Sequence, residues 1–151
     1  IRDYYASRGL GDVYKRQCLI SLPRIADPRG SLSVVQGGEV IPFEIKRAYW
    51  IYDVPAGGER GGHAHRAMSQ LLVAVAGSFN VNLSDGHSWH TYTLNRPFTG
   101  LLIPPGIWRT LDNFSSGAVC LSIVSTPYDT ADYIYDYDEF LRLTADTEPR
   151  L

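Results

Sequence analysis

Short runs of alternating hydrophobic and polar residues make up most of the chain from residue 18 onward. Clear apolar runs lie at 18–25, 70–77 and 118–125, and turns containing glycine and proline separate the runs. Runs of this length, with no long helical stretch between them, are typical of strands in a β-sandwich or barrel. The pattern therefore predicts an all-β fold.

Two segments add detail to this pattern. Within residues 79–94, the pair Asp85-Gly86 lies between two alternating stretches, which predicts a β-hairpin with a type I′ turn. The segment 130–143 instead spaces its apolar residues as one face of a helix. These residues are Ile134, Tyr137, Phe140 and Leu141. We expect a short C-terminal helix that covers the barrel.

Composition and charge exclude several functions. A chain of 151 residues, with 44% hydrophobic and 20% charged residues, fits one globular domain. Its net charge of −2 gives no basic surface for nucleic acid, and its apolar runs are shorter than the roughly 20 residues that span a bilayer. The two cysteines do not suggest a disulfide framework, and Cys120 lies in an apolar run. We expect a cytoplasmic protein with no nucleic-acid or membrane partner.

The two ends of the chain differ from its middle. Residues 1–17 show neither strand alternation nor a sustained helical stripe, and they lack the apolar segment of a signal peptide. We expect 1–17 to be a non-native or disordered leader, 18–143 to form the folded domain, and 144–151 to be a tail.

A His-x-His pair is the main candidate for chemistry. His63 and His65 are two residues apart, so in a strand their side chains point to the same face. Such a pair can be half of a metal site, a catalytic pair, or ordinary polar residues of a sheet. The spacing of the residues downstream distinguishes these readings.

That spacing resembles the two sequence motifs of the cupin superfamily. In the first motif, a His-x-His pair is followed by a carboxylate ligand and then a glycine, at the places held here by Gln70 and Gly77. In the second, a Pro-x-Gly turn precedes a histidine ligand and an asparagine, at the places held by 104–106, Arg109 and Asn113. The resemblance implies a cupin-type double-stranded β-helix, which is a jelly-roll barrel.

Two departures from the cupin motifs bear on the chemistry. Gln70 replaces the carboxylate ligand and Arg109 replaces the second-motif histidine. An arginine does not lose its proton in proteins, and its positive charge opposes a bound cation. We therefore expect no metal, and we expect His63 and His65 to serve as acid and base with pKa values near neutrality.

A closer resemblance covers nearly the whole chain from Leu22 onward. The chain is similar to the WxcM-like sugar 3,4-ketoisomerases, which are metal-free cupins acting on nucleotide-linked 4-keto-6-deoxyhexoses. Matching blocks lie at 27–32, 41–55, 59–65, 94–109, 112–125 and 128–140. One block is slightly altered, because the usual paired aromatic residues read Tyr49-Trp50 here.

The resemblance implies conversion of dTDP-4-keto-6-deoxyglucose to the 3-keto-6-deoxyhexose through an enediol. This reaction needs a base at C3, an acid at C4 and a proton exchange between two oxygens, but no redox cofactor. We expect His63 to serve the carbon atoms and His65 the oxygen atoms. Tyr49 is the third catalytic candidate, since the family has a tyrosine beside its active site. The candidates for substrate binding are Arg29, Arg60, Gln70 and Arg109.

Two other functions remain open at this point. One is a 3,5-epimerase of 4-keto-6-deoxy sugars, which is usually associated with a His–Asp dyad; no carboxylate is clearly paired with His63 or His65 in the sequence. The other is a non-catalytic sugar-binding cupin. We also expect a homodimer, because family members pair their sheets and exposed sheet edges favour association.

Overall fold

The computed structural model describes residues 18–151, so the expectation for residues 1–17 lies outside the described part of the chain. The strands are β1 (Leu19–Ser21), β2 (Arg24–Asp27), β3 (Gly30–Ser33), β4 (Arg47–Ile51), β5 (Arg60–His65), β6 (Gln70–Ala76), β7 (Phe79–Ser84), β8 (Trp89–Leu94), β9 (Thr99–Ile103), β10 (Trp108–Asp112), β11 (Val119–Val124) and β12 (Tyr133–Ile134). The helices are a short 3₁₀ turn, η1 (Thr130–Asp132), and α3 (Tyr137–Thr144).

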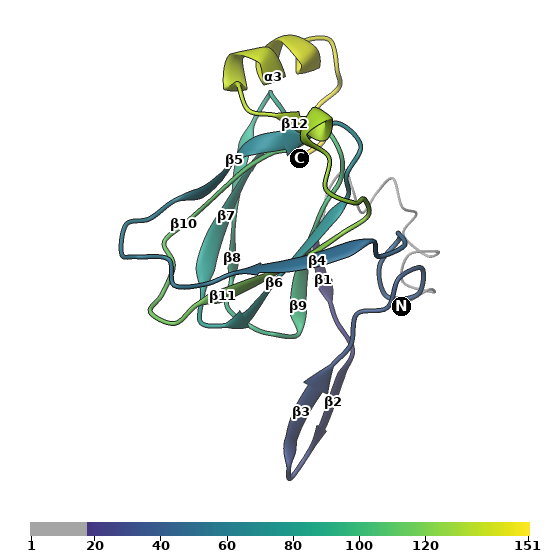
Figure 1. The fold of residues 1–151 in the computed structure, drawn as a ribbon, viewed down its shortest axis with the longest axis vertical. Helices are drawn as coiled ribbons and strands as arrows, with labels where there is room; N and C mark the ends of the chain where they lie inside the picture. The colour runs from purple at the N-terminus through teal and green to yellow at the C-terminus, as the bar shows by residue number, and fades with distance from the viewer. Residues whose placement is uncertain (1–17) are drawn as a thin grey trace.

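Two antiparallel sheets face each other and form a barrel (Figure 1). Their strand orders are β1-β9-β6-β11-β4 and β12-β5-β10-β7-β8. A separate hairpin of β2 and β3 projects from one end of the barrel, and α3 covers the other end (Figure 1). The predicted all-β double-stranded β-helix with a short C-terminal helix is confirmed. Within residues 18–151, no helix is long and apolar enough to cross a membrane.

The strand β6 is apolar on both of its faces, and the packing explains why. Leu72 and Ala74 point between the two sheets, where they join the largest apolar cluster together with Cys120. Leu71 and Val73 point outward and pack beneath the connecting segment that precedes β4. A strand covered on both sides excludes water from both rows of side chains, so its sequence reads as a continuous apolar run.

Glycines of both cupin motifs occupy backbone positions that require them. Gly77 has a φ of +64°, and a Cβ there would lie 2.8 Å from the Cα of Ala118. Gly106 has a φ of +77°, and its N–H donates to the carbonyl oxygen of His65 at 2.7 Å. The second motif is therefore joined directly to the end of β5, where the histidine pair lies.

The predicted hairpin of β7 and β8 is present, but its turn is not type I′. Four residues, 85–88, separate the paired residues Ser84 and Trp89, and Asp85 does not have a positive φ. The Asp85 carboxylate accepts hydrogen bonds from the N–H groups of His87 and Ser88. This side-chain capping stabilises a wider loop than the two-residue turn expected from the Asp-Gly pair.

The predicted helix is shorter than its apolar spacing suggested. Ile134 belongs to β12, where it pairs with Ala64, and the helix begins only at Tyr137. The carboxylate of Asp136 caps this helix by accepting from the N–H groups of the two residues that follow Tyr137. Ile134 and Phe140 are nevertheless buried in one cluster, so the spacing predicted which residues are buried but not where the helix starts.

The segment 144–151 was expected to be a tail; its first residue ends α3, and the residues after it fold back onto the barrel. Asp85 is 1% exposed, and its carboxylate also accepts from the N–H groups of Arg150 and Leu151. Burial raises the pKa of Asp85, but its backbone donors outweigh burial and lower the pKa to about 2. One carboxylate thus joins the β7–β8 loop to the last described residues.

We predict that Asp85→Ala lowers the free energy of unfolding by about 2–4 kcal/mol, because the substitution leaves four partly buried N–H groups without their acceptor. Glu148→Ala, which removes an exposed carboxylate from the same C-terminal segment, should change the free energy by less than about 0.5 kcal/mol. Urea unfolding of the two variants and the wild type measures this difference. Equal losses in both variants would contradict the structural role of Asp85.

Candidate active site

A cavity of about 210 Å³ lies between the two sheets of the barrel. Residues of both sheets form its wall. They are Arg47, Tyr49, Ile51, Arg60, Gly61, His63, Gln70, Leu72, Arg109, Leu111 and Tyr133. The wall therefore contains five of the residues that the sequence singled out, together with two polar residues that it did not, Arg47 and Tyr133.

An irregularity in β5 sets the position of the histidines. His63 pairs with Arg109 of β10, but the pairing shifts by one residue between His63 and Gly61. Gly61 and Gly62 both have positive φ values, and a Cβ on Gly61 would lie 2.9 Å from the carbonyl oxygen of Arg109. Glycines therefore allow this β-bulge, which brings β5 close to β10 and directs His63 into the cavity.

The two histidines share a face, as the sequence predicts. Their ring centroids are 4.8 Å apart and the rings are nearly perpendicular. His63 lines the cavity, whereas His65 is fully buried and is not part of the wall. The ring of Tyr133 contacts both, with centroids 5.1 Å from His63 and 4.3 Å from His65. His63 is therefore the histidine that a ligand in the cavity can touch.

The prediction of histidine pKa values near neutrality is wrong. Burial, and after it the positive charge of Arg109, lower the pKa of His63 from 6.5 to about 4. Burial, Arg109, His63 and Arg47 together lower the pKa of His65 to about 2. Since a buried imidazolium beside a guanidinium is disfavoured, both rings are neutral at pH 7. His63 can therefore accept a proton without first losing one.

His65 is paired with a carboxylate, which the sequence analysis did not identify. Its Nδ1 lies 3.0 Å from Oδ2 of Asp132, at the end of η1. Asp132 and His65 are 67 residues apart in the chain. The only sequence signal for this pairing was that Asp132 lies in a block that matches the family. The same segment was predicted to be a helix.

Arg109 is the largest fully buried side chain, with 1% of its surface exposed. None of its three guanidinium nitrogens has a hydrogen-bond acceptor among residues 18–151. Burial lowers its pKa to about 10, so it keeps its positive charge at pH 7. Since an unpaired buried charge is costly, an oxygen of a ligand in the cavity would be bound strongly here.

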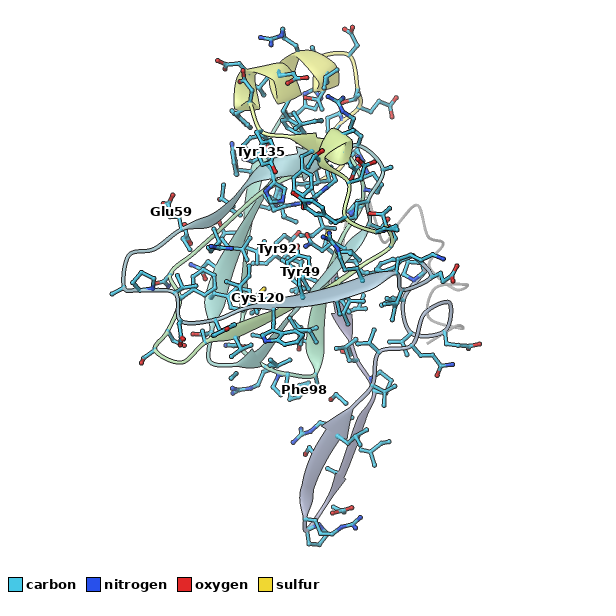
Figure 2. All side chains as sticks on the ribbon, viewed as in Figure 1. Tyr49, Glu59, Tyr92, Phe98, Cys120 and Tyr135 are labelled. Atoms are coloured by element: carbon cyan, nitrogen blue, oxygen red, sulfur yellow. The ribbon has the colours of Figure 1, made fainter. Side chains whose placement is uncertain are left out.

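Gln70 and Tyr49 are joined in a hydrogen-bonded group on the opposite sheet. Nε2 of Gln70 donates to Oη of Tyr49 at 2.9 Å and to Oγ of Ser122 at 2.6 Å. The sequence placed Gln70 among the candidates for substrate binding, and it lines the cavity. Tyr49 points into the barrel from β4 (Figure 2). Because its oxygen accepts from Gln70, its own O–H remains available to the cavity.

The arginines of the site occupy different positions. Arg47 is half-buried and lies over the rings of Tyr49 and Tyr128, at 5.1 Å and 5.3 Å. Arg60 is exposed at the start of β5, at the edge of the cavity. Arg29 does not line the cavity: it lies at the tip of the β2–β3 hairpin, 90% exposed, and pairs with Asp27 at 2.8 Å. The structure therefore brings together every candidate residue except Arg29.

Within residues 18–151, no group of three or more histidine, cysteine, aspartate or glutamate side chains gathers in a way that could hold a metal ion. At the place of the cupin ligands, the wall carries the Gln70 amide and the Arg109 guanidinium beside the histidines. This set of side chains suits oxygen atoms of an organic ligand better than a cation.

The jelly-roll barrel, with both motifs at one internal cavity, defines the class of protein: it is a cupin. Within that class, the chain belongs to the family described as FdtA: WxcM-like, C-terminal, which matches residues 15–145.

Similar proteins are sugar ketoisomerases. A TDP-4-oxo-6-deoxy-alpha-D-glucose-3,4-oxoisomerase from Aneurinibacillus thermoaerophilus is 40% identical over 127 residues, which cover 84% of this chain and 91% of that protein. A 3,4-ketoisomerase from Helicobacter canadensis has a TM-score of 0.82 at 43% identity, covering 85% of this chain and 96% of that one. A mutant of the 3,4-ketoisomerase QdtA from Thermoanaerobacterium thermosaccharolyticum, in complex with TDP-4-keto-6-deoxyglucose, has a TM-score of 0.84 at 36% identity, covering 85% and 94%.

We predict that His63 remains neutral as the pH falls from 8 to about 5 and gains its proton near pH 4, because burial and Arg109 lower its pKa. An NMR titration of the imidazole C–H signals measures this directly. Arg109→Gln removes a nearby positive charge and should raise the pKa of His63, whereas Arg66→Gln, at an exposed arginine just after β5, should not. A wild-type His63 titrating at 6.5 would contradict the prediction.

Proposed function

We propose that this protein is a TDP-sugar 3,4-ketoisomerase that converts TDP-4-keto-6-deoxyglucose to the 3-keto-6-deoxyhexose through an enediol. The observation that carries the proposal is the joint presence, in one cavity wall, of neutral His63 and the unpaired buried guanidinium of Arg109. The names of similar proteins supply the substrate: they act on, or are bound to, TDP-4-oxo-6-deoxy sugars.

In the proposed reaction, His63 acts on the carbon atoms. Its neutral ring takes the proton from C3 and returns a proton at C4, so the same group serves as base and then as acid. The protonated form is short-lived, because burial and Arg109 keep the pKa of His63 low. The low pKa therefore favours prompt transfer of the proton back to the sugar.

The oxygen atoms need stabilisation and an exchange of protons. Negative charge develops on the C4 oxygen as C3 loses its proton, and the Arg109 guanidinium can donate to that oxygen without moving from its buried position. The C3 hydroxyl gives up a proton as the C4 oxygen gains one, so the sugar neither gains nor loses electrons. We assign this exchange to the Tyr49 hydroxyl, because His65 does not line the cavity. His65 acts instead through His63.

A 3,5-epimerase is the second enzymatic candidate. The pairing of Asp132 with His65 removes one argument against it, since the sequence analysis had found no paired carboxylate. The similar proteins favour the ketoisomerase at 36–43% identity. A non-catalytic sugar-binding cupin fits less well, because binding alone does not need a neutral imidazole at the cavity wall.

Incubation with TDP-4-keto-6-deoxyglucose in D2O, followed by NMR, separates the three functions. We expect a new 3-ketone, with deuterium at C4 in the fraction of turnovers in which the proton on His63 exchanges with solvent. Deuterium at C3 and C5 without a 3-ketone would instead indicate an epimerase, and neither a new ketone nor deuterium would indicate binding alone. His63→Asn should reduce turnover on the order of 100- to 10,000-fold. His90→Asn, at an exposed histidine of β8, should leave turnover unchanged.

We also propose that the protein forms a homodimer through the β2–β3 hairpin. Every residue of these two strands is exposed, and the hairpin projects away from the barrel (Figure 1). Ile25 and Leu32 pair across it with 61% and 55% of their surfaces exposed. Two adjacent apolar side chains on a projecting hairpin favour burial against a second copy. Such contact is also the route by which Arg29, at the hairpin tip, would reach a substrate.

We predict that the wild type sediments as a dimer at micromolar concentration and that the double variant Ile25→Glu, Leu32→Glu sediments as a monomer. Two charges placed in an apolar contact would be desolvated without partners, which opposes association. Leu143→Glu, at a 50% exposed leucine of α3, should remain dimeric. A monomeric wild type would refute the proposed dimer.

A further inference from the structure

The segment formed by η1 and β12 holds a carboxylate against the histidine pair. Oδ2 of Asp132 lies 3.0 Å from Nδ1 of His65, and the Asp132 side chain is 11% exposed. Oδ1 of Asp132 accepts from the N–H of Ala67 at 2.7 Å, and its backbone oxygen accepts from the N–H of Arg66 at 2.9 Å. Three bonds to consecutive residues therefore keep this carboxylate beside β5.

The carboxylate determines which nitrogen of His65 carries a proton. An ionised carboxylate can only accept hydrogen bonds, so Nδ1 of the neutral ring must carry the proton and donate it to Asp132. Nε2 is then an acceptor with a free lone pair. Nε2 is buried and has no hydrogen-bond partner among residues 18–151. With the other tautomer, the same nitrogen would present an N–H to its surroundings.

The surroundings of His65 are rich in positive charge. Arg109 and Arg47 both lower the pKa of His65, and His63 next to it gains a positive charge in the proposed reaction. An N–H directed into this environment would oppose protonation of His63, whereas a lone pair and a nearby negative charge support it. Asp132 supplies both conditions.

We propose that Asp132 is a positioning residue for catalysis: it holds His65 as the Nδ1–H tautomer, so that the histidine pair can accommodate the proton that His63 takes from the sugar. This inference rests on the proposed ketoisomerase function. Asp132 bonds His65 and does not line the cavity, so it acts on the substrate through the histidines and through its charge, which favours the charged form of Arg109.

Asp132→Asn tests the proposal with little change of shape. The N–H of Ala67 selects the side-chain oxygen of the new asparagine, because two donors would otherwise meet. The amide NH2 group then faces Nδ1 of His65, which must become an acceptor, and the proton moves to Nε2. We expect kcat to fall on the order of 100- to 10,000-fold with little change in KM. The ¹⁵N chemical shifts of the His65 ring should report Nδ1–H in the wild type and Nε2–H in the variant.

Asp129→Asn is the matched control, since it makes the same substitution at the start of the same 3₁₀ turn. Asp129 caps the turn by accepting from the N–H of Ala131 at 3.0 Å, and asparagine can do the same. Its kcat and its His65 shifts should match the wild type. An unchanged kcat in Asp132→Asn, or an equal fall in Asp129→Asn, would overturn the proposal.

The ¹⁵N spectrum of the wild type tests the tautomer of His65 even if Asp132→Asn fails to fold. An Nε2–H ring in the wild type would overturn the proposal by itself. The ¹⁵N measurement does not depend on turnover. A wild type that fails to convert the TDP-sugar would therefore refute the proposed function without changing the tautomer result.

Discussion

The buried, positively charged guanidinium of Arg109, which has no hydrogen-bond acceptor among residues 18–151, is the constraint on which the site depends. Burial of the unpaired Arg109 opposes folding by several kcal/mol, and the apolar packing on both faces of β6 offsets that cost. In return, a fixed cation lies in a medium of low dielectric, where its effect on nearby groups is large. The same charge that can stabilise an oxyanion also keeps His63 neutral. Arg109 thus has two effects: it keeps His63 able to accept a proton, and it can itself donate a hydrogen bond to the oxygen.

The histidine pair lies between charges of opposite sign. Arg109 of β10 pairs with His63, and Asp132 of η1 bonds His65. A proton arriving at His63 therefore enters a ring whose neighbour is already polarised toward a carboxylate. This arrangement requires β5, β10 and η1 to hold their relative positions closely, and the bulge at Gly61 and the bond from Gly106 to the His65 carbonyl help to maintain them.

The fold and the core of the site could be predicted from the sequence because their signals are local. Strand periodicity, the shared face of His63 and His65, and the motif spacing of Gln70 and Arg109 all depend on residues near one another in the chain. The features that were not predicted depend on contacts between residues far apart in the chain. Asp132 meets His65 across 67 positions, the Asp85 loop is held in part by Arg150 and Leu151, and the low histidine pKa values arise from burial and a charge on another strand.

The long separation between His65 and Asp132 also bears on how the protein is made. During synthesis, β5 and the residues after it leave the ribosome well before η1, so His65 exists for a time without its carboxylate. Contacts between such distant residues form late, since the entropy of closing a long loop opposes them. A chain that is incompletely translated or incompletely folded therefore contains both histidines but not their final electrostatic environment. The electrostatic environment of the histidine pair is therefore complete only at the end of folding, when η1 lies against β5.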